Sequence, residues 1–223
     1  MDSKSEQETV MRKLSVILVS LLLLGLGGIL RADENVGKAQ PQGTNFETAT
    51  FAGGCFWCIQ PPFDKLNGVV RTTVGFTGGT EKDPTYKQVS YGKTGHAESI
   101  EIVYDPGKVT YEELLDVYWM NIDPTDSGGQ FVDRGKQYRP AIFYHNEAQK
   151  KAAEASKEKL DKSGRFDKPI VVEIVEATEF YPAEDYHQKF YLKDPVTYKT
   201  YRAGSGRDQF IKEYWGAAAA ASH

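Results

Sequence analysis

The alternation of apolar and polar residues predicts a protein built on several β-strands. Residues 47–52 and 98–104 alternate with the period of two that a half-buried strand shows. Residues 69–76 are rich in β-branched side chains and residues 138–144 are largely apolar, so both segments favour strands as well. A further strand is expected at 170–176.

Two helices are predicted from their capping residues. Thr110 and Glu113 have the spacing of a capping box, which opens a helix that Pro124 ends. Asn146 caps a long polar helix that reaches about Lys162. Both helices are therefore expected to begin at a side chain that binds free backbone N–H groups.

Proline and glycine mark less regular segments. Because proline is tolerated only in the first turn of a helix, Pro61 and Pro62 predict a helix that starts near Pro61, after an irregular turn over residues 55–60. Glycine-rich loops are expected at 78–96 and 126–135. A short helix is predicted at 183–193, and the residues after it show no pattern that places them.

The order of elements predicts the fold class. Strand, helix, strand, strand, helix, strand is the order of a ferredoxin-like split βαβ fold. The sequence therefore predicts an α+β two-layer sandwich with an extra helix, an extra strand and long coil additions. Its first strand would deliver Cys55 to the end of the sheet where the loops that finish at His96 and Gln137 also arrive.

The N-terminal segment is not expected to belong to this fold. Arg12 and Lys13 precede an apolar run over residues 14–30, which is the pattern of a secretory signal. The run is nearly long enough to span a bilayer, so an uncleaved anchor is the alternative. The protein is expected to be exported, periplasmic or secreted, or anchored in a membrane through this run. The predicted segments are a signal peptide or anchor at 1–32, a flexible linker at 33–45, a folded domain at 46–216 and a disordered tail at 217–223.

Composition and charge exclude some classes of function. With 40% hydrophobic and 26% charged residues, the 223-residue chain can bury the core of a globular enzyme. A net charge of −4 leaves no basic stripe to neutralise phosphates, so nucleic acid is not expected as a partner. Two cysteines are too few for a disulfide scaffold. Four zinc ligands at suitable spacing are also missing, so no metal site is expected.

Both cysteines lie in a single motif, Gly53-Gly54-Cys55-Phe56-Trp57-Cys58. A thiolate is a working nucleophile, and the Cys-x-x-Cys spacing brings a second sulfur near enough for a short-loop disulfide. The two rings between the sulfurs predict an apolar cup beside the nucleophile. The motif indicates a redox site for a small, partly apolar group, with a buried pair, a structural staple or an exported metal-binding module as alternatives.

Six motifs follow one another along the chain: Gly-Cys55-Phe56-Trp57, Gly-Phe76-Thr-Gly-Gly79, Pro84-Thr-Tyr86, Gly95-His-Ala-Glu98, Asp133-Arg-Gly-Lys-Gln-Tyr138-Arg and Tyr181-x-Ala-Glu-Asp-Tyr-His-Gln188. In this order they resemble the A-type peptide methionine sulfoxide reductases. The resemblance runs from about Thr48 to about Trp215, so it would make the folded domain the catalytic domain of an oxidoreductase.

The resemblance implies that Cys55 attacks the sulfur of a methionine S-sulfoxide, free or peptide-bound, while Phe56 and Trp57 hold the methyl group. A sulfoxide is a polar S–O group on a small apolar stem, so aromatic walls and a proton donor suit it. Glu98 is the implied acid. It must hold its proton near neutral pH, which burial among aromatic rings favours.

Three further site residues come from the resemblance alone. Tyr86 and Tyr138 would bond the sulfoxide oxygen, although either could instead be an ordinary core tyrosine. Asp133 would lie beside the substrate, with a turn-forming aspartate before Gly135 as the alternative. His187 is interpreted as a local structural hydrogen-bonding residue and not as a catalytic one.

The resemblance also implies how the enzyme is recycled. Removal of the oxygen leaves Cys55 as a sulfenic acid, which condenses with a nearby thiol. Many family members carry that thiol in the C-terminal tail, but here only Cys58 or an outside thiol is available. A thioredoxin-like reductant would regenerate the thiols, and an exported protein would need one in its own compartment. No cofactor is implied, and a monomer acting on oxidised proteins or free methionine sulfoxide is expected.

Two departures from the family pattern concern the active-site helix. Gln60 stands where the family commonly has Glu, and Pro61-Pro62 stands where it commonly continues a helix. A displaced helix start would give the Cys55 thiolate less help from the helix dipole. The main alternative function is a general thiol–disulfide oxidoreductase that uses Cys55 and Cys58.

Overall fold

The computed structural model describes residues 45–216. The predicted signal peptide or anchor, the predicted tail and all but the last residue of the predicted linker lie outside the described residues. Within residues 45–216, none of the helices has the length and apolar character needed to cross a bilayer.

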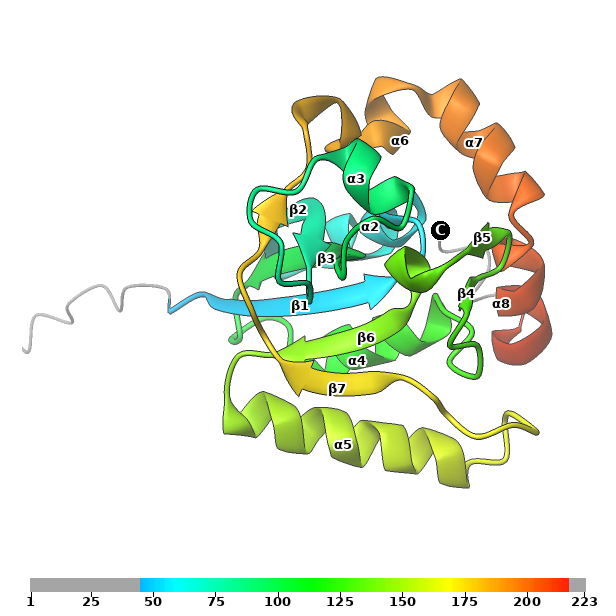
Figure 1. The fold of residues 1–223 in the computed structure, drawn as a ribbon. Coiled ribbons are helices and arrows are strands. Elements are labelled where there is room, and N and C mark those ends of the chain that lie inside the picture. The colour runs from blue at the N-terminus through cyan, green and yellow to red at the C-terminus, as the bar shows by residue number, and fades with distance from the viewer. Residues whose placement is uncertain (1–44, 217–223) are drawn as a thin grey trace, which may run out of the picture. The chain divides into compact units, whose positions relative to one another are not determined.

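A six-stranded sheet forms the centre of this domain (Figure 1). From one edge to the other, its strands are β7 (Glu173–Glu176), β6 (Pro140–Tyr144), β1 (Glu47–Gly53), β3 (Ala97–Tyr104), β2 (Val69–Thr77) and β8 (Tyr181–Pro182). Neighbouring strands are antiparallel except β6 and β7, which are parallel. The sheet and its helices confirm the predicted α+β class. All five predicted strands are present, although the one expected at 170–176 is shortened to β7.

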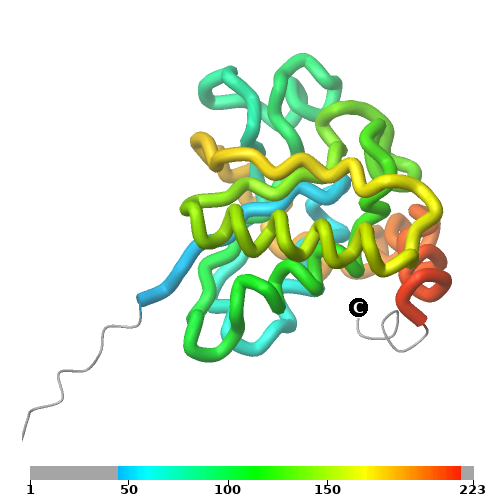
Figure 2. The backbone as a smooth tube through the Cα atoms, turned by 90° about the horizontal axis from the view of Figure 1, so that it is seen from below, coloured from blue at the N-terminus to red at the C-terminus, as the bar shows by residue number. Residues whose placement is uncertain are grey.

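The two capped helices begin as predicted. They are α4 (Tyr111–Met120) and α5 (Glu147–Lys162). Thr110 Oγ1 accepts a hydrogen bond from the Glu113 N–H at 3.2 Å, and Glu113 Oε2 accepts one from the Thr110 N–H at 2.8 Å. Asn146 Oδ1 accepts one from the Gln149 N–H at 2.9 Å. Figure 2 shows α5 lying along β6 and β7, with which it is in contact.

Aromatic rings join β1 to its covering helices. The ring centroid of Phe51 on β1 lies 4.9 Å from that of Tyr118 on α4 and 5.7 Å from that of Phe63 on α2 (Phe56–Asp64). All three side chains are fully buried. Large buried rings contribute much of the packing energy of a core, so this stack holds α2 against the end of the sheet.

The start of α2 differs from the prediction. The helix begins at Phe56, directly after Cys55, and Pro61 and Pro62 lie inside it. The expected irregular turn over residues 55–60 is therefore wrong. Pro62 has no N–H to donate to the carbonyl oxygen of Cys58, four residues earlier. Arg202 Nη1 supplies that hydrogen bond instead, at 2.8 Å, so the helix continues through the prolines with a partner from elsewhere in the chain.

The two predicted loops contain short elements. The first holds α3 (Tyr86–Ser90), which opens with a capping box formed by Thr85 and Gln88. The second holds the hairpin of β4 (Gly129–Gln130) and β5 (Asp133–Arg134), followed by the 3₁₀ turn η1 (Lys136–Tyr138).

The C-terminal part folds into helices that the sequence left unplaced. The predicted helix at 183–193 is instead the 3₁₀ turn η2 (Asp185–His187) and the short helix α6 (Phe190–Lys193). Helices α7 (Pro195–Gly204) and α8 (Arg207–Trp215) follow. Figure 1 shows α7 and α8 at the end of the sheet toward which β1 points. This end of the sheet carries the candidate site.

Candidate active site

Cys55 occupies the position between the last residues of β1 and the first turn of α2. Its carbonyl oxygen accepts hydrogen bonds from the N–H groups of Cys58 at 3.0 Å and Ile59 at 3.3 Å. Gly54 has a φ of 80°, and a Cβ placed there would come within 2.5 Å of the Gln130 Cβ. A glycine is therefore required immediately before the nucleophile. The helix start is not displaced from Cys55, contrary to the expectation based on Pro61.

The two thiols are free and buried, with Cys55 7% and Cys58 1% exposed. Burial is the main cause that raises the pKa of Cys55, and the hydrogen bond to Cys58 adds to it. That same hydrogen bond is the main cause that lowers the pKa of Cys58, and the charges of Arg207 and Arg202 contribute. Of the two thiols, Cys58 is therefore the one that ionises more readily.

Glu98 lies on β3 and reaches the start of α2. Its Oε2 accepts the hydrogen bond of the Phe56 N–H at 3.0 Å, and its side chain is only 1% exposed. Burial raises the pKa of Glu98 from 4.5 to about 8, outweighing the lowering effect of the Phe56 bond. A carboxylic acid that keeps its proton at neutral pH thus lies one peptide unit from Cys55.

Tyr86 and Asp133 lie in the two segments that were predicted to be loops, whereas Tyr138 was expected to begin a strand and instead ends the 3₁₀ turn η1. Burial raises the pKa of both phenols, and the charges of Glu98 and Cys55 raise both further. Burial also raises the pKa of Asp133, whose Oδ1 accepts a hydrogen bond from the Tyr201 hydroxyl at 2.5 Å. The structure therefore brings all three residues into the electrostatic surroundings of the cysteine pair.

Phe56 and Trp57 belong to an aromatic cluster beside the cysteines. The Phe56 ring lies 5.9 Å from Phe76 and 6.3 Å from Tyr86 between centroids, and it is buried. The Trp57 ring stacks on Phe190 of α6 at 3.9 Å. These contacts form one apolar wall from α2, α3, β2 and α6.

His187 fixes the Trp57 side chain. The Trp57 Nε1–H donates to His187 Nδ1 at 3.0 Å, and the imidazole also lies 4.3 Å from the Tyr86 ring centroid. Burial lowers the pKa of His187, which suits a neutral ring that accepts a hydrogen bond at Nδ1. Its predicted interpretation as a structural hydrogen-bonding residue agrees with these contacts.

Gln60 explains one departure from the family pattern. Its Nε2 donates to Thr72 Oγ1 at 2.9 Å, and its Oε1 accepts from the Lys189 N–H at 2.8 Å. The side chain is fully buried. An amide can donate and accept at once, whereas an ionised glutamate can only accept. Gln60 thus ties α2 both to β2 and to the start of α6.

Three site residues on α7 and α8 were missed by the sequence analysis. Tyr201 bonds Asp133, and the guanidinium groups of Arg202 and Arg207 bond the backbone at Cys58 and Gly53. A signal for the helix that carries Tyr201 was present in the sequence. Asp194 followed by Pro195 is a common helix start, and Asp194 Oδ1 does accept from the Thr197 N–H at 3.1 Å.

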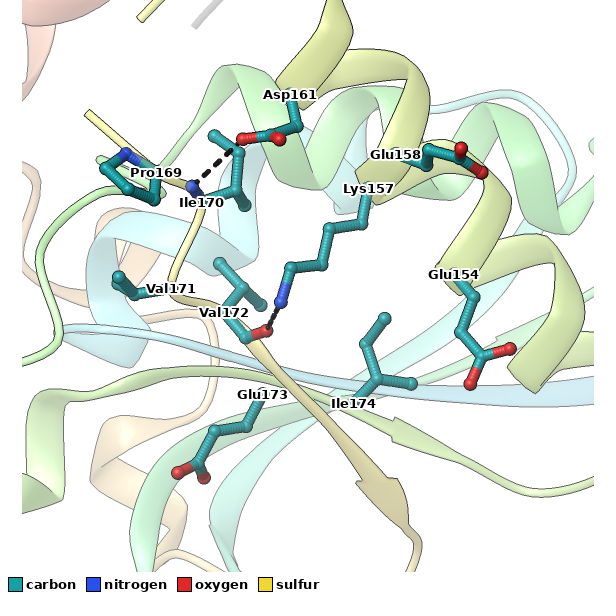
Figure 3. A pocket seen from close by; sticks show the side chains of 10 residues that line it. All are labelled: Glu154, Lys157, Glu158, Asp161, Pro169, Ile170, Val171, Val172, Glu173 and Ile174. Atoms are coloured by element: carbon teal, nitrogen blue, oxygen red, sulfur yellow. Dashed lines mark hydrogen bonds between the residues drawn. The ribbon is translucent and has the colours of Figure 1, made fainter. Parts of the chain in front are cut away.

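A hollow between α5 and β7 is a separate feature (Figure 3). Lys157 Nζ donates to the Val172 carbonyl at 2.7 Å, and Asp161 Oδ1 accepts from the Ile170 N–H at 3.3 Å. None of the predicted site residues lines it. Its polar side chains join α5 to the segment before β7, so it is not the candidate site. Among residues 45–216 no group of three or more His, Cys, Asp or Glu side chains is arranged to hold a metal ion.

Comparisons with known proteins agree with the site. The family model described as peptide methionine sulfoxide reductase matches residues 47–219. The chain is 57% identical over 171 residues to the peptide methionine sulfoxide reductase MsrA of Listeria monocytogenes, which covers 77% of this chain and 97% of the relative. It is 55% identical over 170 residues to the MsrA of Bacillus licheniformis, with coverage of 76% and 94%.

A solved structure is similar over the same region. The crystal structure of Mxr1 from Saccharomyces cerevisiae in reduced form superposes with a TM-score of 0.64 at 34% identity, covering 68% of this chain and 87% of that one. The family match spans the whole of the folded domain, from β1 to beyond α8. The chain belongs to the peptide methionine sulfoxide reductase family, as the motifs around Cys55 predicted.

Proposed function

We propose that this protein reduces the S-sulfoxide of methionine, free or within peptides, to methionine. One observation carries this function: the buried Glu98 carboxyl, whose pKa burial raises to about 8, accepts a hydrogen bond from the backbone N–H that directly follows Cys55. A sulfur nucleophile and a proton donor are thereby held at one helix terminus, which is the pair that removal of a sulfoxide oxygen requires.

The first step consumes one thiol and one sulfoxide. Cys55 passes its proton along its hydrogen bond to Cys58 and attacks the sulfoxide sulfur as a thiolate. Glu98 donates its proton to the oxygen, which passes from the methionine sulfur to the Cys55 sulfur as the S–O bond breaks, and the transient bond between the two sulfurs then breaks. The products are methionine, in which the sulfur is reduced, and the Cys55 sulfenic acid, in which the cysteine sulfur is oxidised. Glu98 is left as a carboxylate.

The surrounding rings and hydroxyls position the substrate. Phe56 and Trp57 receive the methyl group, and the Trp57 indole is held in place by His187 and Phe190. Tyr86 and Tyr138 donate hydrogen bonds to the sulfoxide oxygen; their raised pKa values keep both hydroxyl protons available. Asp133 is proposed to lie beside the substrate, and the Tyr201 hydroxyl that donates to its Oδ1 would hold it there.

Cys58 resolves the sulfenic acid. Its thiol loses a proton and its sulfur attacks Cys55, which forms the Cys55–Cys58 disulfide and expels the hydroxyl as water. Two protons leave as water, and they are the ones that Cys55 and Glu98 held at the start. A thioredoxin-like dithiol then reduces the disulfide, restores both protons and is itself oxidised to a disulfide.

Location and assembly are part of the proposal. Arg12, Lys13 and the apolar run over residues 14–30 support export or membrane anchoring, and a reductant of the same compartment would then serve the enzyme. The protein acts as a monomer on oxidised proteins or free methionine sulfoxide. Sequencing the N-terminus of the mature protein tests whether the leader is cleaved at about Ala32.

The domain itself is a ferredoxin-like split βαβ core with additions. The order β6-β1-β3-β2, in which each neighbouring pair is antiparallel, supports this description. The additions include the edge strands β7 and β8, the helix α5, the short helices α3 and α6, and the helices α7 and α8.

The function is tested by mixing the reduced protein with methionine S-sulfoxide in the absence of reductant. One equivalent of methionine and one intramolecular disulfide are expected, both measured by mass spectrometry. Adding a thioredoxin-like dithiol should convert the single turnover into continuous turnover. Disulfide exchange without any methionine would overturn the proposal and favour a general thiol–disulfide oxidoreductase.

A further inference from the structure

Two buried arginines enclose the turn that carries the cysteines. Arg202 on α7 is 5% exposed and Arg207 at the start of α8 is 1% exposed. Arg202 Nη1 donates to the Cys58 carbonyl at 2.8 Å, and Arg207 Nη2 donates to the Gly53 carbonyl at 3.0 Å. The two guanidinium groups therefore bond the backbone at both sides of Cys55.

The positive charges of these groups are incompletely matched. Arg202 Nε bonds Asp208 at 2.7 Å, but its buried Nη2 has no partner. Arg207 bonds the neutral carbonyls of Asn121 and Gly53, and its buried Nε has no partner. No carboxylate among residues 45–216 forms an ion pair with Arg207. A buried guanidinium without an anion is costly, so the geometry calls for a negative charge beside it.

Cys58 is the group placed to carry that charge. The ionisable groups around it are Cys55, Glu98 on β3, Asp133 on β5, Tyr198, Tyr201 and Arg202 on α7, and Arg207 on α8. Glu98 keeps its proton at neutral pH and the phenols are neutral, so the carboxylates that oppose the two arginines are Asp133 and Asp208, the latter bonded to Arg202. Within the described part of the chain Arg207 has no carboxylate bonded to it, which leaves the Cys58 thiol as the further group able to carry negative charge. The hydrogen bond to Cys55 and then the positive charges of Arg207 and Arg202 lower the pKa of Cys58, and Cys58 in turn acts to raise the pKa of both arginines, as a thiolate beside two cations would.

We propose that Arg202 and Arg207 are positioning residues that hold Cys58 as a thiolate in the reduced enzyme and receive it as the leaving thiolate when the Cys55–Cys58 disulfide is reduced. The disulfide step rests on the proposed function. It assigns a direction to recycling: a thiolate of the reductant attacks the Cys55 sulfur, a mixed disulfide forms with Cys55, and the electron pair of the broken S–S bond leaves on Cys58.

Direction follows from two physical differences between the sulfurs. A thiol of lower pKa is the better leaving group in thiol–disulfide exchange, and the arginines favour Cys58 in that role. In the reduced structure Cys55 is also the more exposed of the two, at 7% against 1%. The second thiol of the reductant then attacks the reductant's first sulfur, which is bonded to Cys55 in the mixed disulfide. This releases Cys55, which takes up a proton.

The charge effect is tested without substrate in a Cys55→Ser background, where Cys58 is the single thiol. Thiolate absorbance near 240 nm is followed against pH. Arg202→Met is expected to raise the pH midpoint of Cys58 ionisation by about one pH unit. Arg202→Lys is expected to restore this midpoint because the charge is kept. Arg139→Met is the control, since Arg139 also bonds backbone carbonyls, those of Lys136 and Gly95, but does not face Cys58.

A second variant keeps the test decisive if Arg202→Met fails to fold. Asp208→Asn removes the exposed carboxylate that neutralises Arg202 while keeping an oxygen acceptor, so the Cys58 midpoint should fall. An unchanged midpoint in Asp208→Asn, or in a folded Arg202→Met, overturns the proposal. With two cysteines present, Arg202→Met should shift the disulfide equilibrium with glutathione about tenfold toward the oxidised form, which is about 30 mV more negative.

The direction of recycling is tested with the oxidised wild-type protein and a thioredoxin-like reductant whose second cysteine is changed to serine. Fragmentation mass spectrometry of the trapped complex should locate the mixed disulfide at Cys55. Attachment at Cys58 overturns the assignment. Failure of the proposed function gives a different result, because no methionine would form from methionine sulfoxide while the pH titration of Cys58 would still report on the arginines.

Discussion

Helices α4 and α2 both pack against β1, but they begin in opposite ways. The first free N–H groups of α4 are bonded by Thr110 and Glu113, which are neighbours in sequence. Cys55 makes no side-chain cap at the start of α2, and the Phe56 N–H is bonded by Glu98, 42 residues away. A local cap only stabilises a helix. A cap supplied by a buried acid from another strand also places that acid beside the nucleophile.

At the start of α2, burial of Glu98 disfavours its charged form, and this is what makes the residue useful as an acid. A carboxylate at a helix N-terminus is normally favoured in its charged form. Burial reverses this preference for Glu98, whose pKa rises to about 8 although it accepts a backbone N–H. The helix start at Cys55 thus combines weak capping with an acid that retains its proton. Four substitutions test this contrast, from the largest expected effect to the smallest.

Cys55→Ser should abolish methionine formation, because a hydroxyl cannot replace the thiolate in attack on the sulfoxide. The free energy of unfolding should not fall, since serine is among the preferred residues at the position before a helix. Methionine release and chemical denaturation measure the two effects. Residual reduction of methionine sulfoxide by this variant would mean that another group is the nucleophile.

Cys58→Ser should release one equivalent of methionine and then lose continuous turnover with a thioredoxin-like dithiol. The Cys55 sulfenic acid would accumulate, because the chain has no third cysteine. Trapping with a sulfenic-acid reagent and counting methionine per enzyme check this expectation. Full thioredoxin-linked turnover in the variant would show that an outside thiol resolves the sulfenic acid.

Glu98→Gln should slow the single-turnover reduction by about 10²–10⁴-fold, the usual contribution of a general acid. Alkylation of Cys55 should change far less, because the amide can still accept the Phe56 N–H. Rapid-quench measurement of methionine compares the reduction rate of the variant with that of the wild type. An unchanged rate would remove Glu98 from the acid role.

Glu98→Gln should lose activity but gain stability relative to the wild type as pH rises. Because folding raises the pKa of Glu98 from 4.5 to about 8, its protonation favours the folded state fully below pH 4.5, and this contribution is lost as pH rises to about 8. Glu98→Gln should therefore become more stable relative to the wild type between pH 5 and pH 8. Thermal denaturation across this range is the measurement, and a constant difference would contradict the raised pKa.

Thr110→Ala should lower the free energy of unfolding by about 1 kcal/mol, the typical value of an N-terminal cap. Methionine formation should stay at the wild-type rate, because α4 contributes no group to the site. Denaturation with urea and an activity assay measure both quantities. A loss of activity without unfolding would show that the two helix starts are coupled through β1.

The sequence by itself determined the features that depend on near neighbours. Alternation defined the main strands, and Thr110 and Asn146 marked the starts of α4 and α5, because strands and caps arise from interactions over a few residues. The motifs around Cys55 and Glu98 were also sufficient to predict the family. Helix α7 was not predicted, although Asp194 followed by Pro195 is a helix-start signal in the sequence.

Only the tertiary structure decided how the site works. Helix α2 begins at Phe56 and continues past Pro62 because Arg202, 144 residues from Cys58, donates a hydrogen bond to the Cys58 carbonyl that the proline leaves without a donor. The proton on Glu98 depends on burial, which exists only once the sheet and its helices have packed. Charge and proton placement depend on the dielectric surroundings and on distant partners, and neither can be read from local residue patterns.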